Sequence, residues 1–222
     1  MIIKPNNIFS NNIHCKGLFT FENAMANTAK NPLSGTWSGT TLYYNSECKF
    51  GTKSLDLSSM SKNYSIDFTP KIEQGTYISF WVYATSLPAS SGYVVCFSDN
   101  GDNNDLRFYH VVSTGYFYFS CKIGGVITYS SGDLGPFNLN TWHFIQCYIV
   151  SANLIVMILD GKYKRILEPT NQLSFTTYST AMNTTYYANV ERQFIGYLDS
   201  LQIKTGCSIS ESSLYNIKNR ES

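Results

Sequence analysis

The segment Thr76-Tyr-Ile-Ser-Phe-Trp-Val-Tyr83 carries the clearest structural signal in the chain. Successive side chains of a β-strand point to opposite faces, so this segment is apolar on both sides. Ile78, Phe80 and Val82 share one face, and Tyr77, Trp81 and Tyr83 share the other. The segment Trp142-His-Phe-Ile-Gln-Cys-Tyr-Ile-Val150 repeats the pattern. Such strands lie centrally in a sheet, with one face on the core and the other against a groove or a loop, which predicts a two-layer β architecture.

Strand-like runs recur along most of the chain, and turn residues separate them. Asp160-Gly161 directly follows the aliphatic run 154–159 and is the strongest hairpin signal, because a tight turn of this kind needs positive φ at its central residues. The expected strands cover about 14–21, 52–57, 63–69, 76–84, 92–98, 105–112, 115–122, 125–130, 141–150, 153–160 and 193–204.

Three segments depart from the strand pattern. Ser208-Ile-Ser-Glu211 has the form of a capping box, and the apolar spacing that follows fits a helical turn, so we expect a short C-terminal helix at 210–218. Residues 168–190 are rich in Thr, Tyr and Asn and are expected to form a long loop. Residues 1–13 form a polar N-terminal extension, which leaves 14–222 as one domain of a length common for a β-sandwich.

The composition narrows the class of protein. Charged residues make up 14% of the 222 residues and aromatic residues 15%, whereas a typical domain is about 25% charged. These values exclude a coiled coil and a disordered charged tail. The formal net charge of +1 provides no general attraction to nucleic acid or to an anionic membrane. We therefore expect no nucleic-acid partner and no membrane insertion.

Targeting signals and cysteines add little chemistry. The first residues lack the apolar stretch of about 7–15 residues that a signal peptide needs, so we expect a soluble protein made in the cytosol.

The six cysteines contain no Cys-x-x-Cys pair, which argues against a zinc ribbon or a thioredoxin-type site. Cysteines inside strand-like runs are expected to be buried as small hydrophobic residues. The pair considered for a disulfide is Cys15 with Cys207.

Seven short motifs follow one another in a family-like order. They are 18–22 (LFTFE), 49–55 (KFGTKSL), 64–68 (YSIDF), 75–82 (GTYISFWV), 141–144 (TWHF), 159–162 (LDGK) and 196–203 (GYLDSLQI). Together they resemble the laminin-G-like and concanavalin A-like jelly-roll domains over about residues 17–217. The resemblance implies an all-β fold, an antiparallel two-sheet jelly-roll β-sandwich with a short C-terminal helix. Domains of this kind mostly bind rather than catalyse, and many recognise glycans.

The resemblance also implies a metal site. Many members of this family hold one structural calcium ion, and the corresponding positions here are Glu22 and Asp199. Calcium prefers oxygen ligands, and an ion between these residues would fasten the first strand to the last. The alternative is that both are ordinary polar residues at strand ends.

The fold alone does not decide whether the protein catalyses a reaction, because one fold hosts many functions. Retaining glycosidases of this fold carry Glu-x-Asp-x-x-Glu on one strand, and none of the seven Glu residues here has Asp two positions later. His14, His110 and His143 lie on separate segments without ligand spacing, so we expect structural roles for them. The protein is therefore not expected to be an enzyme. A polysaccharide-degrading enzyme that uses Tyr, His and Arg stays as an alternative.

The most polar loop is the first candidate for ligand binding. Between Ser98 and Arg107 it combines carboxylates and amides that could hold an ion or grip sugar hydroxyls. The same residue types also build an ordinary hairpin turn. The candidate ligand-binding residues of this loop are Asp99, Asn100, Asp102, Asn104, Asp105 and Arg107.

Aromatic residues in or beside loops are the second candidate group, since sugars pack their C–H surfaces on aromatic faces. An alternative is that these rings cover the sandwich or a subunit interface, where tyrosine is common. The residues favoured are Tyr43, Tyr44, Tyr186 and Tyr187, and Trp37, Tyr116 and Tyr118 also qualify.

These observations lead to a hypothesis for function. The leading one is a non-enzymatic carbohydrate-binding or surface-attachment module on a virion exterior, as a tail-fibre, receptor-binding or capsid-decorating protein. Its expected partners are a glycan or glycosylated surface and other virion subunits, with a homo-trimer as the expected assembly. The alternative is a purely structural decoration or assembly protein that binds no ligand.

Overall fold

The computed structural model describes residues 15–22, 28–29, 35–38, 44–59, 64–68, 70–89, 91–99, 103–111, 113–129, 134–176, 179–182 and 194–207. These ranges form strands, turns and loops and contain no helix. Accordingly, no helix that could cross a lipid bilayer occurs among them. The predicted N-terminal extension at 1–13 and the predicted helix at 210–218 lie outside the described residues.

The larger sheet has eight strands and contains both segments with apolar faces on either side. Its strands are β1 (Cys15–Phe19), β3 (Tyr44–Asn45), β4 (Ser54–Asp56), β7 (Tyr77–Ala84), β12 (Trp142–Ser151), β13 (Leu154–Leu159), β14 (Tyr163–Leu167) and β17 (Gly196–Lys204). Their order is β14-β13-β12-β7-β17-β4-β3, and β1 pairs with β17 beside this path. The two segments predicted to be central, now β7 and β12, are direct neighbours in the middle of the sheet.

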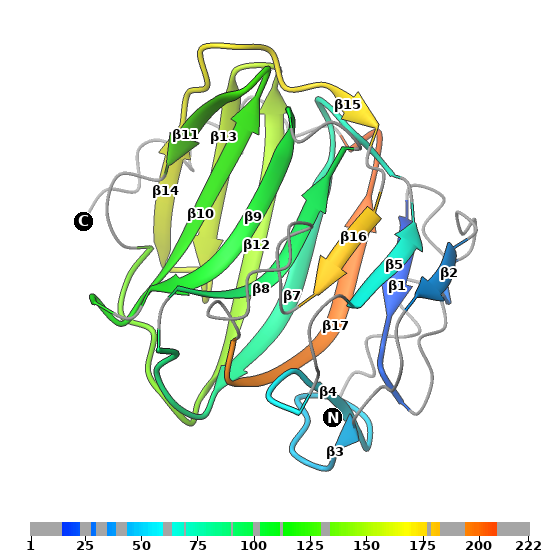
Figure 1. The fold of residues 1–222 in the computed structure, drawn as a ribbon, viewed down its shortest axis with the longest axis vertical. Helices are drawn as coiled ribbons and strands as arrows, with labels where there is room; N and C mark the ends of the chain where they lie inside the picture. Colours follow the sequence, from blue (N-terminus) through cyan, green and yellow to red (C-terminus); the bar gives the residue numbers. More distant parts are fainter. Residues whose placement is uncertain are drawn as a thin grey trace.

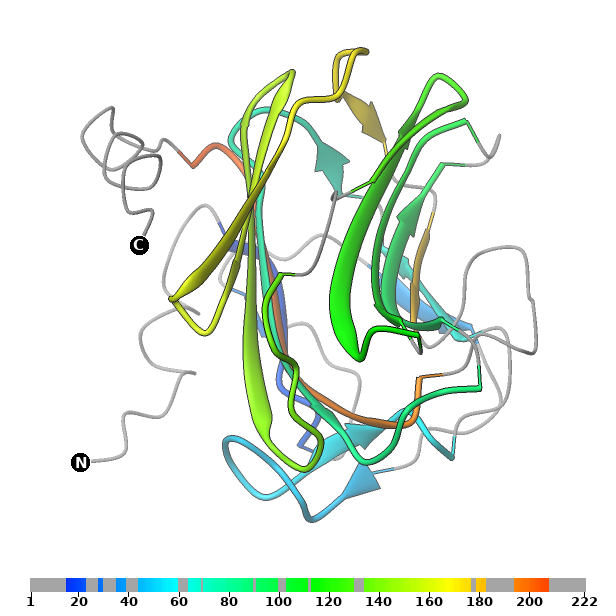
Figure 2. The same cartoon turned by 90° about the vertical axis from the view of Figure 1, so that its left-hand side faces the viewer.

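The smaller sheet has seven strands and packs against the larger one, so that Figure 2 shows two layers. Its strands are β2 (Gly35–Ser38), β5 (Tyr64–Phe68), β8 (Gly92–Ser98), β9 (Asp105–Val111), β10 (Tyr116–Ile123), β11 (Val126–Tyr129) and β16 (Ser179–Met182). Their order is β11-β10-β9-β8-β16-β5-β2 (Figure 1). A small separate sheet joins β6 (Lys71–Ile72) to β15 (Phe175–Thr176). The described strand pairs are antiparallel, which confirms the predicted all-β, two-sheet architecture.

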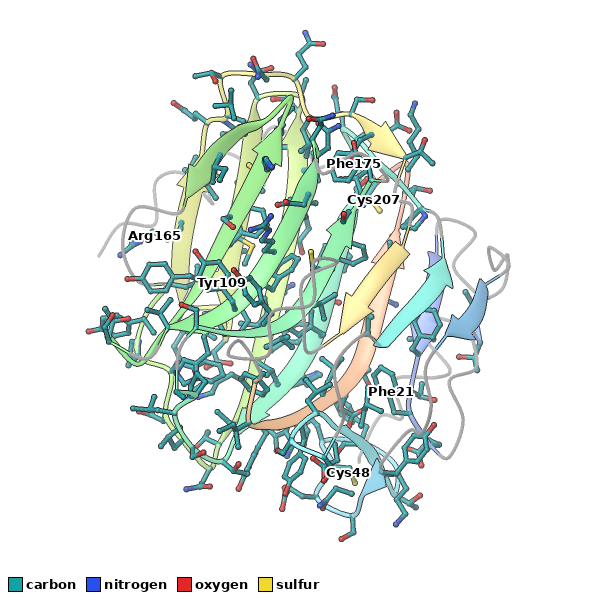
Figure 3. The ribbon with its side chains drawn as sticks, in the orientation of Figure 1. Phe21, Cys48, Tyr109, Arg165, Phe175 and Cys207 are labelled. Atoms are coloured by element: carbon teal, nitrogen blue, oxygen red, sulfur yellow. The ribbon has the colours of Figure 1, made fainter. Side chains whose placement is uncertain are left out.

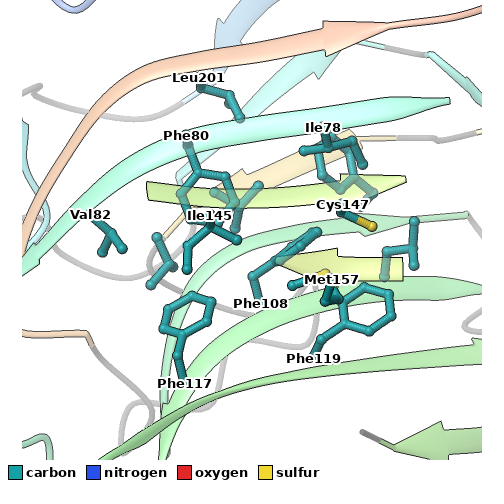
Figure 4. Close-up of a cluster of buried hydrophobic side chains, with 14 of the residues drawn as sticks. Ile78, Phe80, Val82, Phe108, Phe117, Phe119, Ile145, Cys147, Met157 and Leu201 are labelled. Atoms are coloured by element: carbon teal, nitrogen blue, oxygen red, sulfur yellow. The ribbon is translucent and has the colours of Figure 1, made fainter. Parts of the chain in front are cut away.

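The core lies between the two layers and is rich in phenylalanine. Phe80 of β7 contacts Phe108 and Phe117 of the smaller sheet, with ring centroids 5.3 and 6.3 Å apart. Figure 4 shows this cluster, in which strands of both sheets contribute buried side chains. Cys96, Cys121 and Cys147 are buried free thiols, as predicted for small hydrophobic residues.

One sequence-based expectation is wrong, and one open question is answered. The expected loop at 168–190 contains β15 and β16, and β16 pairs with β8 and β5 inside the smaller sheet. A short polar strand of this kind is stabilised by partners far away in the chain, which a local pattern does not contain. The disulfide considered between Cys15 and Cys207 does not form, because Cys207 is a free thiol. Cys15 lies opposite Lys204, so Cys207 falls beyond the end of β17, where its N–H bonds Gly75 O at 2.8 Å.

The Asp160-Gly161 hairpin forms as predicted and also anchors the neighbouring strand. Asp160 and Gly161 adopt φ values of 54° and 70°. Asp160 Oδ2 lies 2.7 Å from His143 Nδ1, and Asp160 Oδ1 accepts a 2.7 Å bond from the Phe144 N–H. Burial acts to raise the pKa of Asp160, but these bonds outweigh it and lower the pKa. His143 Nε2 accepts the Asn138 N–H at 3.0 Å, so the predicted structural role of this buried histidine is confirmed.

A pair of carboxylates, Asp199 and Glu22, fastens the loop at 47–53 to the sheet. Asp199 Oδ2 accepts the N–H groups of Lys49 and Phe50, each at 2.9 Å. Glu22 accepts the N–H and the hydroxyl of Thr52, at 2.9 and 2.8 Å. Burial raises the pKa of Asp199 to about 6, because the bonds to these N–H groups only partly offset the lost solvation. The loop is therefore held by an acid that binds its proton more tightly in the folded protein.

The core contact predicts the effect of truncating Phe80. Phe80→Ala removes a fully buried ring between the layers and should lower the free energy of unfolding by about 3–5 kcal/mol, measured by urea denaturation. Leu87→Ala, at a residue that is 44% exposed, should change it by less than about 0.5 kcal/mol. Equal effects of the two variants would contradict the assignment of Phe80 to the core.

Asp199 predicts a pH dependence of stability. Its pKa is about 6 in the folded protein against 3.8 as the ordinary value, so its protonation stabilises the fold fully below pH 4. This contribution is lost as the pH rises through 6, and amounts to on the order of 3 kcal/mol. Asp199→Asn removes the titration but keeps an acceptor oxygen. In urea titrations with a chelator, wild type should lose stability relative to Asp199→Asn between pH 4 and 7, whereas the exposed change Glu168→Gln should not alter the profile. If the stability of wild type and of Asp199→Asn changed with pH in parallel, the raised pKa of Asp199 would be refuted.

Candidate functional site

Three tyrosines form a row across the outer face of the smaller sheet. Tyr93 lies opposite Tyr109, and Tyr109 lies opposite Tyr118, on β8, β9 and β10. Their ring centroids are 5.3 and 6.0 Å apart, and the second pair is stacked at 26°. Phe108 and Phe117, their sequence neighbours, point into the core, so alternation directs the tyrosines outward. Tyr118 is partly exposed, whereas Tyr93 and Tyr109 (labelled in Figure 3), the centre of the row, are 4% and 8% exposed.

A charged pair lies on the same face, in the next positions along β9. Arg107 forms an ion pair with Asp105, whose side chain is 2% exposed, against 19% for Arg107. Burial acts to lower the pKa of Arg107, but the Asp105 charge outweighs it and raises the pKa, so the guanidinium keeps its proton. Ser120 and Cys96 lie opposite Arg107 on the flanking strands and are also buried. Burying charged groups costs free energy, and here an ion pair is largely withdrawn from solvent on the face of the sheet that points away from the core. This unusual placement marks the region as a candidate ligand site.

The arrangement combines two kinds of recognition. The partly exposed ring of Tyr118 offers planar apolar surface, with the buried rings of Tyr109 and Tyr93 beside it, and the guanidinium and carboxylate offer donors and acceptors in a fixed orientation. The strands hold these groups rigidly, so little conformational entropy is lost when a ligand binds. Such a surface can bind a ligand that has both apolar C–H faces and hydroxyl groups.

Asp99 and Asn104, predicted as ligand residues, also hold the turn together. Asn103 N–H and Asn104 Nδ2 donate to the two oxygens of Asp99, at 3.2 and 2.5 Å. Asn104 Oδ1 accepts the Gly124 N–H at 3.0 Å, which ties the β8–β9 turn to the β10–β11 turn. Both residues thereby fix the hairpins that carry Asp105 and Arg107.

The structure does not bring all the predicted residues together. Tyr44 packs against the core from β3, at the end of the molecule opposite the β10–β11 turn (Figure 1). Tyr116, at the start of β10, is partly exposed. The side chain of Trp37 lies outside the described part of the structure. Five more predicted positions lie outside the described residues, namely Asn100, Asp102, Tyr43, Tyr186 and Tyr187.

Sequence reasoning missed Tyr93 and Tyr109. The turn at Thr114-Gly115 contained the signal for Tyr109, because a tight connection there pairs Val111 with Tyr116 and so places Tyr109 opposite Tyr118. Tyr93 could not be placed in this way, because a β-bulge between Tyr93 and Val95 changes the register of β8 against β9.

The carboxylates predicted to bind calcium meet at one loop. Glu22 and Asp199 both bond to residues 49–52, and the Glu22 charge contributes to the raised pKa of Asp199. One oxygen of each carboxylate accepts two hydrogen bonds, whereas the other accepts one. The hard oxygen donors therefore fit a calcium ion only as monodentate ligands. Within the described part of the chain, at this loop as well as elsewhere, no three His, Cys, Asp or Glu side chains cluster as a metal site.

The sequence itself has no recognisable relatives among the proteins compared. No family model matches the chain, and no curated protein is significantly similar to it in sequence. The specific laminin-G-like and concanavalin A-like label therefore stays a prediction.

Solved structures do share the fold. Domain 4 of AbnA, a GH43 extracellular arabinanase from Geobacillus stearothermophilus in complex with arabinotriose, matches with a TM-score of 0.69 and 14% identity over 91% of this chain and 97% of that one. Botulinum neurotoxin type C, from a study of its interaction with two ganglioside molecules, matches with a TM-score of 0.60 and 12% identity, over 93% of this chain and 51% of that one. A carbohydrate esterase from the Shiga toxin-encoding bacteriophage phi24B matches with a TM-score of 0.55 and 14% identity, over 86% of this chain and 98% of that one. The chain thus spans about half of the neurotoxin chain and nearly all of the other two, and the likeness establishes a shared β-sandwich fold.

Proposed function

We propose that this protein is a carbohydrate-binding module and that its glycan lies on the tyrosine row of the smaller sheet. The observation that carries the proposal is the alignment of Tyr93, Tyr109 and Tyr118 beside the ion pair of the buried Asp105 with the partly exposed Arg107. Aromatic faces suit the C–H surfaces of a sugar, and the charged pair suits its hydroxyls. The names of the neighbours support the same class of ligand, since one was solved with arabinotriose and one study concerns gangliosides.

Binding rather than catalysis is part of this proposal. The sequence lacks the Glu-x-Asp-x-x-Glu pattern that retaining glycosidases of this fold need. The bacteriophage neighbour is named as a carbohydrate esterase, so an enzyme acting on a polysaccharide is the alternative. Release of reducing sugar, unsaturated product or acetate from mixed polysaccharides would favour that alternative.

A place on a virion exterior extends the proposal. Its support is the low charge and high aromatic content of the chain, together with the bacteriophage origin of one neighbour. Other virion subunits would then be partners, and the assembly would be a trimer. Detection of the protein in purified virions, with a trimeric mass by light scattering, would test this extension. A purely structural decoration protein is the alternative that complete silence on a glycan array would favour.

A glycan array with the whole chain, followed by calorimetry on its best ligand, tests the binding site. Tyr118→Ala should weaken binding roughly five- to thirtyfold, because it removes the most exposed ring of the row. Tyr148→Ala, a partly buried tyrosine on the outer face of the other sheet, is the matched control and should bind like wild type. Equal losses in both variants, or unchanged binding by Tyr118→Ala, would place the glycan elsewhere.

We also propose one structural calcium ion at Glu22 and Asp199. Calcium at 100 times its dissociation constant should raise the melting temperature by roughly 5–10 °C for a domain of this size. Asp199→Asn should abolish the rise, whereas Glu168→Gln, at an exposed position, should retain it. A wild-type melting temperature that does not respond to calcium would remove the ion from the proposal.

A further inference from the structure

A second aromatic row crosses the outer face of the larger sheet, on the far side of the sandwich. Trp142, Tyr83 and Tyr197 lie opposite one another on β12, β7 and β17. Their ring centroids are 5.3 and 5.6 Å apart, and each side chain is partly exposed. We call these three residues the outer aromatic row.

The loop after β3 covers the neighbouring rings but leaves the outer aromatic row partly open. Trp81 stacks on Phe144 with centroids 4.8 Å apart, and Phe50 of the loop meets Trp81 edge-on at 5.8 Å. Lys49 Nζ lies 4.3 Å from the centre of the Trp81 ring. An ammonium group therefore already occupies one ring of this face in a cation–π contact.

Carboxylates border the outer aromatic row at both ends. Glu47, which is exposed, accepts the Trp142 Nε1–H at 3.0 Å. Asp56 lies opposite Tyr197 on β4, where the N–H of Ser58 and the hydroxyl of Ser59 hold its carboxylate at 3.0 and 2.9 Å. Burial raises the pKa of Tyr197, and the charges of Asp56 and Glu47 raise it further, so both carboxylates act on this ring.

The charge balance around the row favours a cation. Glu47 and Asp56 lie beside the outer aromatic row. The nearby cation Lys49 lies over the ring of Trp81, which is outside the row. Aromatic faces attract cations, and the two carboxylates add to that attraction. An apolar protein partner is a poorer fit, because charged residues are depleted from the centres of protein interfaces.

We propose that the outer aromatic row binds an organic ammonium group, with Glu47 and Asp56 as its counter-charges. The site does not depend on the glycan surface proposed above, which lies on the other sheet and presents the guanidinium of Arg107. The two outer faces would thus recognise different chemistry, hydroxyls on one and a positive charge on the other. A sugar could carry such a charge as a free amine, and a small quaternary amine would offer the same group.

The experiment follows the indole N–H signal of Trp142 by NMR in the ¹⁵N-labelled full chain, with Trp142→Phe to assign it. Tetramethylammonium chloride is titrated against sodium chloride at equal ionic strength. A saturable shift of the Trp142 signal with the ammonium salt alone is the expected result. Glucosamine and N-acetylglucosamine, tested in the same way, separate an amino sugar from its neutral counterpart.

Variants connect the shift to the site. Glu47→Gln keeps an acceptor for Trp142 but removes the charge, and Tyr197→Leu removes one ring; each should raise the dissociation constant about two- to fivefold. Glu73→Gln removes a carboxylate that is paired with Lys71 elsewhere and should bind like wild type. The proposal is overturned if sodium chloride gives the same shift, if Glu47→Gln binds as tightly as wild type, or if N-acetylglucosamine binds as well as glucosamine. If Tyr197→Leu fails to fold, the exposed Glu47→Gln variant decides alone.

Discussion

The antiparallel register that joins β12, β7 and β17 is the constraint on which the rest of the structure depends. It sets Phe144 opposite Trp81 and Trp81 opposite Asp199. Because side chains alternate along each strand, the same register sends Phe80 inward to meet the phenylalanines of the smaller sheet. A shift by one residue would exchange the core face for the outer face on the whole strand, so this register is specified by burial.

The outward residues of the two sheets differ in charge although both are rich in aromatic rings. The smaller sheet carries its tyrosine row, of which Tyr118 is partly exposed, beside Arg107, which forms an ion pair with Asp105. The larger sheet presents tyrosines and tryptophans beside Glu47 and Asp56. Rings on a sheet surface are rigid, so small changes in the surrounding charge decide which polar group of a ligand is attracted.

Two carboxylates, Asp160 and Asp199, fix the loops at the rim of the sandwich, and their environments push their pKa values in opposite directions. Asp160 is bonded to His143 and to a backbone amide at the surface end of a hairpin, and these bonds lower its pKa. Asp199 is fully buried and lies near Glu22, so lost solvation dominates and raises its pKa to about 6. The hairpin stabilises the ionised form of Asp160, whereas ionisation of Asp199 costs folding free energy.

The sequence alone determined the features that depend on local pattern. The alternation in 76–83 and 142–150 predicted the central strands, Asp160-Gly161 predicted a hairpin, and the position of three cysteines inside strand-like runs predicted their burial. Only the tertiary structure decided the pairing of β16 with β8, the tyrosine row through Tyr93, and the bond from Trp142 to Glu47, which are 95 residues apart. The reason is physical: alternation and turn preference act between neighbours in the chain, whereas cross-strand contacts form between residues that only the completed packing of the layers brings together.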